Sequence, residues 1–189
     1  MNLDKLRKSV EKAALDKAKC SMQINKSTGE KNALYRKKFK VLNEKYWLLQ
    51  EKLDYYESNY IASDNEIELK CFGNNIENMY SIYLKDEGIK VGHIDYRGYH
   101  DSLICGDVGY VIDARYSGHN YAYKSLILLS SYLYQNNVSD FYISVFMDNM
   151  PSLKTILKAI INYGGEVIGV NGNMVTFKCL TRKNDKIIK

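Results

Sequence analysis

The chain has 189 residues, which is enough for one well-cored domain with an extension but too few for two full-sized enzyme domains. Hydrophobic residues make up 46% of it and charged residues 26%, and no apolar run approaches the roughly 18 residues of a membrane span. This composition indicates a soluble globular protein. Residues 1–8 are rich in charge and no apolar segment follows them, so we expect no secretory signal, no membrane partner and a cytoplasmic location.

The positive charge is concentrated near the N-terminus. Residues 1–60 contain 14 lysines and arginines against 8 aspartates and glutamates, whereas residues 61–189 contain 13 against 14. Lysines on such a segment are ordinarily a solvated helix face, so nucleic acid is not the expected partner. A role as an adaptor for nucleic acid or an anionic surface stays open as an alternative.

The cysteines and histidines are scattered along the chain. None of them forms a C-x-x-C pair or the closely spaced histidines that zinc sites use. We therefore predict no metal site and expect the cysteines to be buried free thiols. The residues concerned are Cys20, Cys71, Cys105, Cys179, His93, His100 and His119.

Two helices are predicted in the first third of the chain. Residues 2–20 carry one apolar stripe at helical spacing, with Lys17 in one of its positions, and residues 25–30 have the composition of a turn. A second stripe follows at spacings of 4-3-4-3-4-3. Its members are Tyr35, Phe39, Leu42, Tyr46, Leu49, Leu53 and Tyr56. We predict a basic helical hairpin over residues 1–60, either docked on the following domain or forming a homodimer through Tyr46 and Leu49.

After residue 60 the pattern changes to short apolar runs separated by turns. Four strands in an antiparallel meander come first, then a helix, a buried strand, a second helix and a hairpin with an Asn-Gly turn. The predicted ranges are 66–72, 79–84, 90–96, 108–112, 122–135, 141–146, 152–163, 167–170 and 174–179, with turns at 73–75, 85–88 and 97–106. This order predicts an α/β fold with a mixed, mostly antiparallel sheet flanked by helices over residues 61–182, followed by a flexible tail at 183–189.

The segment from Arg115 to Ala122 joins a strand to a long helix. The backbone N–H groups at a helix N-terminus bind phosphate well. Gly118 lets the backbone approach an oxygen closely, Asn120 tolerates a left-handed conformation and Arg115 adds a positive charge. The segment therefore has the chemistry of a pyrophosphate site, although an ordinary strand-to-helix turn would use the same residues.

This segment resembles the acetyl-CoA signature of the GNAT superfamily of N-acetyltransferases. That signature is an arginine or glutamine, a glycine three residues later and a glycine or alanine two residues after that. Arg115 and Gly118 match, and Asn120 replaces the last position. Asn149 and Ser152 match, in spacing and order, a second family element after the fifth strand, where an ordinary helix start is the alternative. The resemblance covers residues 66–180 and implies a GNAT-like fold.

The resemblance also implies the cofactor and its binding residues. Acetyl-CoA is the implied co-substrate, with no metal, and its pantetheine arm is expected to lie between two separating strands. Main-chain groups of Val111, Ile112 and Asp113 are expected to pair with the arm. The pyrophosphate is expected on the loop residues Tyr116, Ser117, Gly118, His119, Asn120, Tyr121 and Ala122. The implied activity is acetyl transfer to a primary amine of a small molecule or peptide; a binding or assembly module that has lost catalysis is the alternative.

Catalytic residues are less well marked than the cofactor site. Asp107 stands where many GNAT enzymes have a glutamate, so it is a candidate base, with a turn aspartate at a strand start as the alternative. Tyr110 is a candidate acid, as are Tyr121, Tyr123 and Tyr163. The usual family tyrosine falls at Ile156, whose aliphatic side chain cannot donate a proton.

Overall fold

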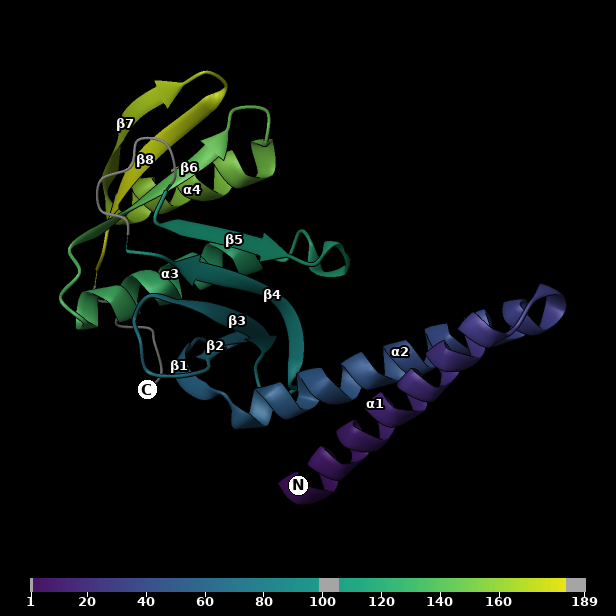
Figure 1. Cartoon of the computed structure of the whole chain (residues 1–189). Coiled ribbons are helices and arrows are strands. Elements are labelled where there is room, and N and C mark those ends of the chain that lie inside the picture. The colour runs from purple at the N-terminus through teal and green to yellow at the C-terminus, as the bar shows by residue number, and fades with distance from the viewer. Residues whose placement is uncertain (1, 99–105, 183–189) are drawn as a thin grey trace. The chain divides into compact units, whose positions relative to one another are not determined.

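The computed structural model describes residues 2–98 and 106–182. Residues 99–105 of the turn predicted at 97–106, which include His100 and Cys105, and the tail at 183–189 therefore lie outside the described residues. The chain divides into two compact units at residues 57 and 58. The first is an all-helical hairpin and the second contains all the strands (Figure 1). Each unit is described by itself.

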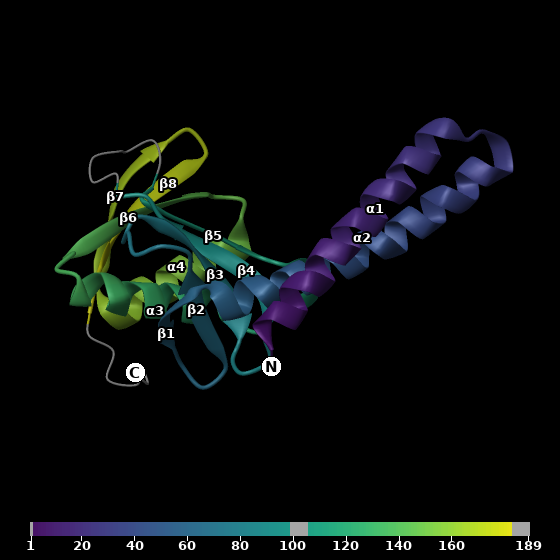
Figure 2. The same cartoon turned by 60° about the horizontal axis from the view of Figure 1, so that its bottom comes forward.

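Helices α1 (Leu3–Lys26) and α2 (Gly29–Glu57) form the hairpin and run side by side in both cartoon views (Figures 1 and 2). Asn2 begins α1, because its side chain accepts a hydrogen bond from the Lys5 N–H at 3.1 Å. The first helix is longer than predicted. The turn expected at 25–30 shrinks to the two residues between the helices.

Members of the two apolar stripes pack against each other inside the hairpin, whereas Tyr56 of the second stripe is 44% exposed. Leu6 and Val10 of α1 pack with Leu53 of α2, and Tyr46 and Leu49 pack around them. Tyr46 and Leu49, which were offered as a dimer contact, thus already have partners within the chain. Lys17 fits the stripe because its ammonium lies over the rings of Tyr46, at 4.7 Å, and Trp47, at 5.3 Å.

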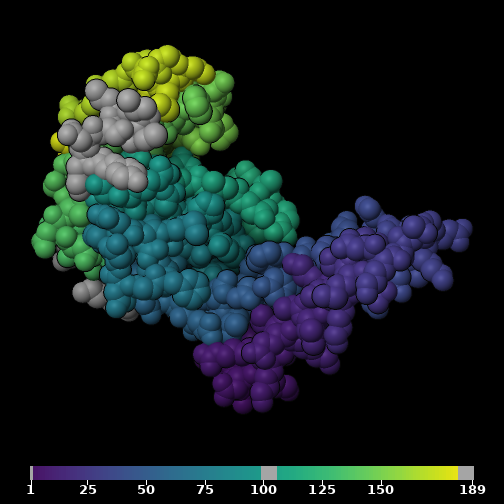
Figure 3. Space-filling model, viewed as in Figure 1, coloured from purple at the N-terminus to yellow at the C-terminus, as the bar shows by residue number. Residues whose placement is uncertain are grey.

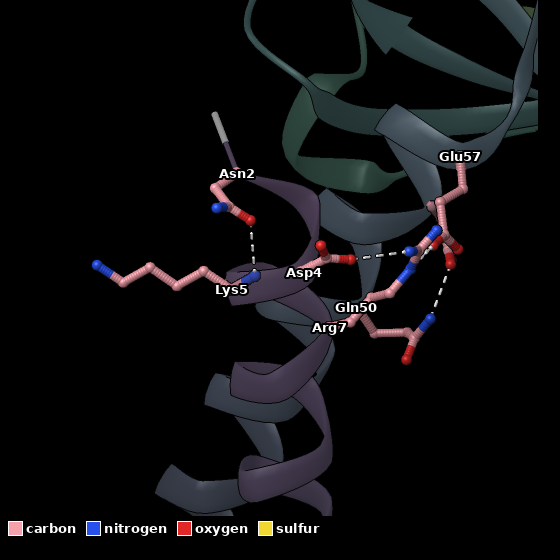
Figure 4. Close-up of polar contacts among 7 residues, drawn as sticks. Asn2, Asp4, Lys5, Arg7, Gln50 and Glu57 are labelled. Atoms are coloured by element: carbon pink, nitrogen blue, oxygen red, sulfur yellow. Dashed lines mark hydrogen bonds and ion pairs between the residues drawn. The ribbon is translucent and has the colours of Figure 1, made fainter.

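Charged side chains join the open ends of the two helices. Arg7 on α1 donates from Nε to the Glu57 carboxylate at 2.7 Å and from a terminal nitrogen to Asp4 at 3.3 Å (Figure 4). The guanidinium therefore lies between two carboxylates, one from each helix. Because these groups are largely solvent-exposed, their contribution to stability is small beside that of the apolar stripe.

The packing of the hairpin generates a stability prediction for Leu53, which is 7% exposed. Leu53→Ala should lower the free energy of unfolding of the hairpin by about 2–4 kcal/mol, because it leaves a cavity in the stripe. Leu48→Ala on the same helix is the control, since Leu48 is 69% exposed and its truncation should cost below about 0.5 kcal/mol. Urea unfolding followed by helical circular dichroism measures both, and equal losses would contradict the buried stripe.

The second unit contains two antiparallel sheets. Strands β1 (Asn59–Ser63), β2 (Ile67–Cys71), β3 (Asn78–Leu84), β4 (Ile89–Tyr96) and β5 (Val108–Ile112) form the first sheet in chain order. Strands β6 (Asp140–Phe146), β7 (Gly165–Asn171) and β8 (Met174–Leu180) form the second, with β8 in the middle. The predicted meander is confirmed. Strand β1 was missed, because its run of five residues directly follows α2 with no turn composition between them.

Two helices cover the sheets and complete the core. Helix α3 (Tyr121–Gln135) packs on β1, β2 and β5, and helix α4 (Met150–Tyr163) packs on the three-stranded sheet and on α3. The side chains between these layers are fully buried in most cases, among them Ile67, Leu69, Ile94, Leu129, Leu133 and Phe141. The predicted α/β arrangement, a mostly antiparallel sheet flanked by helices with an N-terminal helical pair, is confirmed.

The described residues also bear on the thiols, metals and membrane. Cys20, Cys71 and Cys179 are buried and free. Within residues 2–98 and 106–182, no three His, Cys, Asp or Glu side chains lie close enough to hold a metal ion. None of the helices in that part of the chain is long and apolar enough to cross a membrane.

Candidate functional site

The site begins where strands β5 and β6 come closest. The Asp107 carboxylate, just before β5, accepts a hydrogen bond from the Tyr142 N–H of β6 at 2.9 Å. A Cβ atom on Gly106 would lie 2.6 Å from both the Ile143 Cα and the Ser144 N, so only glycine permits this approach. The two strands are therefore held tightly together at residues 106 and 107.

Beyond this point the strands diverge, and across the described residues no ladder joins β5 to β6 (Figure 1). A cavity of about 180 Å³ opens between them. We call it the β5–β6 gap. It is lined by Val108, Gly109, Tyr110, Ile143, Ser144, Val145, Phe146, Asn149, Ser152 and Ile156.

The register of the neighbouring ladders shows which backbone groups face the gap. Asp113 N donates to Val91 O at 2.9 Å, and Arg97 N donates to Asp107 O at 2.8 Å. Because donors alternate along an antiparallel strand, the odd-numbered residues of β5 bond to β4 and the even-numbered ones face away from it. The backbone groups of Tyr110 and Ile112 therefore point away from β4, and of these two residues Tyr110 lines the gap. The main-chain groups of Val111 and Asp113 do not face the gap, because β4 uses them.

The same alternation applies to β6. Met147 N donates to Asn173 O at 2.8 Å, so the odd-numbered residues of β6 bond to β8. The backbone groups of Tyr142, Ser144 and Phe146 consequently point toward β5. Asp107 satisfies the first of these N–H groups, and the other two residues lie along the open gap.

A short loop leads from β5 into α3. A 3-10 turn at Ala114–Tyr116 begins after Asp113, whose carboxylate accepts from the Arg115 N–H at 3.0 Å. Gly118 has a φ of 86° and Asn120 a φ of 61°, so both are left-handed, and Asn120 adopts the conformation expected of it. This loop ends at the first turn of α3, where the leading N–H groups have no acceptor within the helix.

A second and larger cavity of about 410 Å³ lies at this loop, and we call it the loop cavity. The space-filling view shows the surface indented between the teal atoms of this region and the green atoms of α4 (Figure 3). Its lining residues come from β5, the loop and both helices. They are Tyr110, Ile112, Tyr116, Ser117, Gly118, Asn120, Tyr121, Ala122, Tyr123, Pro151, Ser152, Lys154, Thr155 and Lys158.

Most of the predicted loop residues line this cavity, but Arg115 and His119 do not. The Arg115 guanidinium donates to both oxygens of the Asp113 carboxylate, at 3.1 and 2.7 Å. These hydrogen bonds lower the pKa of Asp113 to about 2. His119 stacks on the ring of Tyr121, with ring centres 5.4 Å apart. The signature arginine therefore binds its own loop carboxylate, two residues earlier in the chain.

Tyr110 and Ser152 line both cavities, so the gap and the loop cavity are neighbours that share these two residues. The Tyr110 hydroxyl donates to the Ser152 carbonyl at 3.3 Å, and burial raises the pKa of this tyrosine. Asn149 begins α4, because its side chain accepts from the Ser152 N–H at 3.3 Å. Asn149 thus both caps a helix and lines the gap.

The sequence interpretation missed the contribution of α4 beyond Ser152. Lys154, Thr155 and Lys158 line the loop cavity. The two lysines lie on one face of the helix because they are four residues apart. That spacing was a usable signal in the predicted helix. Tyr123 was considered as an acid and does line the cavity, whereas Tyr163 lies elsewhere, beside Leu126 and Phe141.

The candidate base Asp107 is 0% exposed and lines neither cavity. Its bond to Tyr142 generates a prediction. Asp107→Ala should lower the free energy of unfolding by about 1–3 kcal/mol, because it leaves a buried N–H without its acceptor. Asp107→Asn retains an acceptor oxygen, so its free energy of unfolding should fall less. Thermal or urea unfolding of the two variants measures both losses. An alanine variant as stable as the wild type would contradict a stabilising role for the hydrogen bond between Asp107 and Tyr142.

No protein-family model matches the sequence, and no curated protein matches it. Among solved structures, the chain is similar to a GNAT-family acetyltransferase from Bacillus anthracis, with 15% identity and a TM-score of 0.51 over 65% of this chain and 99% of the other.

Two further similar structures are acetyltransferases. The ribosomal-protein-S5-alanine acetyltransferase from Vibrio fischeri has 17% identity and a TM-score of 0.45, over 59% of this chain and 64% of that one. An acetyltransferase from Agrobacterium tumefaciens has 13% identity and a TM-score of 0.43, over 72% and 70%. Similarity at such low sequence identity shows the fold alone, and here it rests on the Bacillus anthracis structure. The chain has the fold of the GNAT-family acetyltransferases.

Proposed function

We propose that the protein is an acetyl-CoA-dependent N-acetyltransferase that acts on a primary amine of a small molecule or peptide. The observation that carries the proposal is the adjacency of two cavities. A narrow gap between two strands lies next to a cavity at a helix N-terminus, and Tyr110 and Ser152 line both. Acetyl-CoA combines an extended amide-containing arm with a pyrophosphate, and these two parts match the two halves of the site.

The β5–β6 gap suits the pantetheine arm. Backbone groups of Tyr110 face it from β5, and those of Ser144 and Phe146 face it from β6. An extended chain with amide groups can hydrogen-bond to such an edge as an added strand does. The gap is also closed at one end by Asp107 and Tyr142, which limits how far the arm can enter.

The loop cavity suits the pyrophosphate. A Cβ atom on Gly118 would have no neighbour within 4 Å, so open space lies beside this backbone, and Asn120 turns the chain into α3. Free N–H groups and the positive end of the helix dipole favour an anion at this place. We propose the amides between Gly118 and Ala122 as the pyrophosphate site, with Asn149 and Ser152 beside the arm.

Acetyl transfer requires one proton to leave the ammonium and another to reach the leaving sulfur. We propose Tyr110 as the donor to sulfur. Its hydroxyl lies on the boundary of the two cavities, and burial raises its pKa, so it keeps its proton at neutral pH. We propose that Asp107 is a positioning residue that closes the gap, since its carboxylate is buried and bonded to Tyr142.

Asp95 of β4, and not Asp107, is the proposed proton acceptor. Its Oδ2 accepts from Arg97 Nε at 2.5 Å, and its Oδ1 lies 2.9 Å from the position that a Cβ on Gly109 would take. Gly109 lines the gap, so this partly exposed carboxylate lies beside the proposed thioester arm. An ammonium there could pass its proton to Asp95 directly or through water.

A binding module without catalysis is the second candidate. Ile156 is buried and lines the gap at the position of the usual family tyrosine, which is the observation in its favour. Such a module would bind acetyl-CoA and acetylate nothing. Turnover of acetyl-CoA with a broad panel of amines, read as free thiol release, separates it from an enzyme.

Ligand binding to the native state provides the first test of this function. Acetyl-CoA at about a hundredfold excess over its Kd should stabilise the protein by about 2.7 kcal/mol and raise the melting temperature by about 5–10 °C. Gly118→Asp should abolish the rise, because it puts a carboxylate where the pyrophosphate binds. Gly172→Asp, at another left-handed and open glycine in the β7–β8 turn, is the matched control and should keep it. A folded Gly118→Asp variant that binds normally would contradict the site.

The proposed proton transfers generate a kinetic prediction. Tyr110→Phe should lower kcat about a hundredfold or more with an amine from the panel, because it removes a general acid, while acetyl-CoA affinity stays near that of the wild type. Asp95→Asn should lower kcat also, with a deficit that shrinks as the pH rises and more of the amine is already neutral. Unchanged pH profiles of kcat in both variants would remove these residues from the mechanism.

A further inference from the structure

The loop cavity is positively charged. Lys154 and Lys158 are the charged residues in its lining, and no carboxylate stands among its lining residues. Arg115, the cation that the family signature places here, binds Asp113 and does not line the cavity. The cationic groups at the cavity therefore come from helix α4.

The two lysines differ from other lysines of this unit in their surroundings. Lys124 pairs with Glu66, and Lys178 lies 3.6 Å from Asp140, whereas the ion pairs within the described residues include neither Lys154 nor Lys158. Lys158 instead has its ammonium 4.2 Å from the centre of the Tyr123 ring. An aromatic ring holds a cation in place without neutralising it.

Tyr123 is itself fixed, which makes the position of Lys158 specific. The Tyr123 hydroxyl accepts a hydrogen bond from Asn162 Nδ2 at 3.0 Å, and Asn162 also donates to the Lys158 carbonyl at 2.9 Å. The Tyr123 ring of α3 is thereby joined to α4 through Asn162. Lys154, one turn earlier on α4, lies on the same face as Lys158 and lines the same cavity.

The site thus contains two separate groups that favour anions. The first turn of α3 offers backbone N–H groups to the pyrophosphate. The lysine pair offers two positive charges from helix α4. CoA carries a pyrophosphate and, on its ribose, a separate 3′-phosphate. We propose that Lys154 and Lys158 bind this 3′-phosphate and select CoA over cofactors that lack it. This inference rests on the proposed binding of acetyl-CoA.

The lysine pair is suited to this group for two reasons. A phosphate monoester carries close to two negative charges at neutral pH, so it offsets both ammonium groups and removes their mutual repulsion. Lysine also binds phosphate as a flexible point charge and does not need the fixed geometry of arginine. Because both lysines are exposed, the gain should be moderate and should weaken as salt is added.

The test compares CoA with 3′-dephospho-CoA by isothermal titration calorimetry on the full chain at low salt. The wild type should bind CoA about five- to tenfold more tightly than 3′-dephospho-CoA, consistent with two partly exposed ion pairs. In the Lys154→Gln/Lys158→Gln variant that preference should fall below about twofold. Most of the loss should appear with CoA and little with 3′-dephospho-CoA.

A matched variant controls for net charge. Lys37 and Lys40 are exposed on α2, so Lys37→Gln/Lys40→Gln removes the same two charges from the other unit and should keep the wild-type preference. Circular dichroism spectra confirm that all three proteins are folded. Melting curves with each ligand give a second measure of the preference.

The outcomes separate this inference from the proposed function. Binding of both ligands with equal affinity by the wild type would overturn the 3′-phosphate site and leave the acetyl-CoA site standing. An equal loss of affinity for both ligands in the double variant would overturn it too, since the lysines would then serve the pyrophosphate. Binding of neither ligand by the wild type would overturn the proposed function and this inference with it.

Discussion

The hydrogen bond from the Tyr142 N–H to the Asp107 carboxylate marks the place where the sheet stops being continuous. At this point a side chain does what a neighbouring strand would otherwise do, because it satisfies a buried backbone donor. Gly106 next to it allows the two backbones to touch. The strands are thereby fixed at one end and free to diverge at the other, and every part of the site depends on that divergence.

Both helices of the site begin near the open end of the gap. Helix α3 follows β5 through the loop at Gly118 and Asn120, and helix α4 follows β6 through Asn149. Each strand therefore leads into a helix whose first residues line the site. Tyr110 lies between the two, bonded to the Ser152 carbonyl, and couples the gap to the loop cavity. Divergence of one strand pair thus creates a place for an extended chain and for an anion at once.

Local patterns in the sequence predicted most of the elements, and non-local contacts decided the rest. The helical stripes, strand β6 and the turn at Gly118 were predicted from residues within one or two turns of each other. The strand order was not, since β6 lies at the edge of its sheet and β8 in the middle. The role of Asp107 was not, because its partner lies 35 residues away. Which of Val111 and Ile112 has its backbone groups bonded to β4 depends on the register between β4 and β5, and that too is set across strands.

Tyrosine rings explain how this chain places lysines without neutralising them. Lys17 occupies an apolar stripe because its ammonium lies over Tyr46, and Lys158 lies over Tyr123 in the same manner. Arg115 shows the opposite arrangement, since two hydrogen bonds to Asp113 offset its charge. A cation over a ring keeps its full charge for a second partner. The loop cavity therefore takes its positive charge from α4, whereas the family signature would place that charge on the loop.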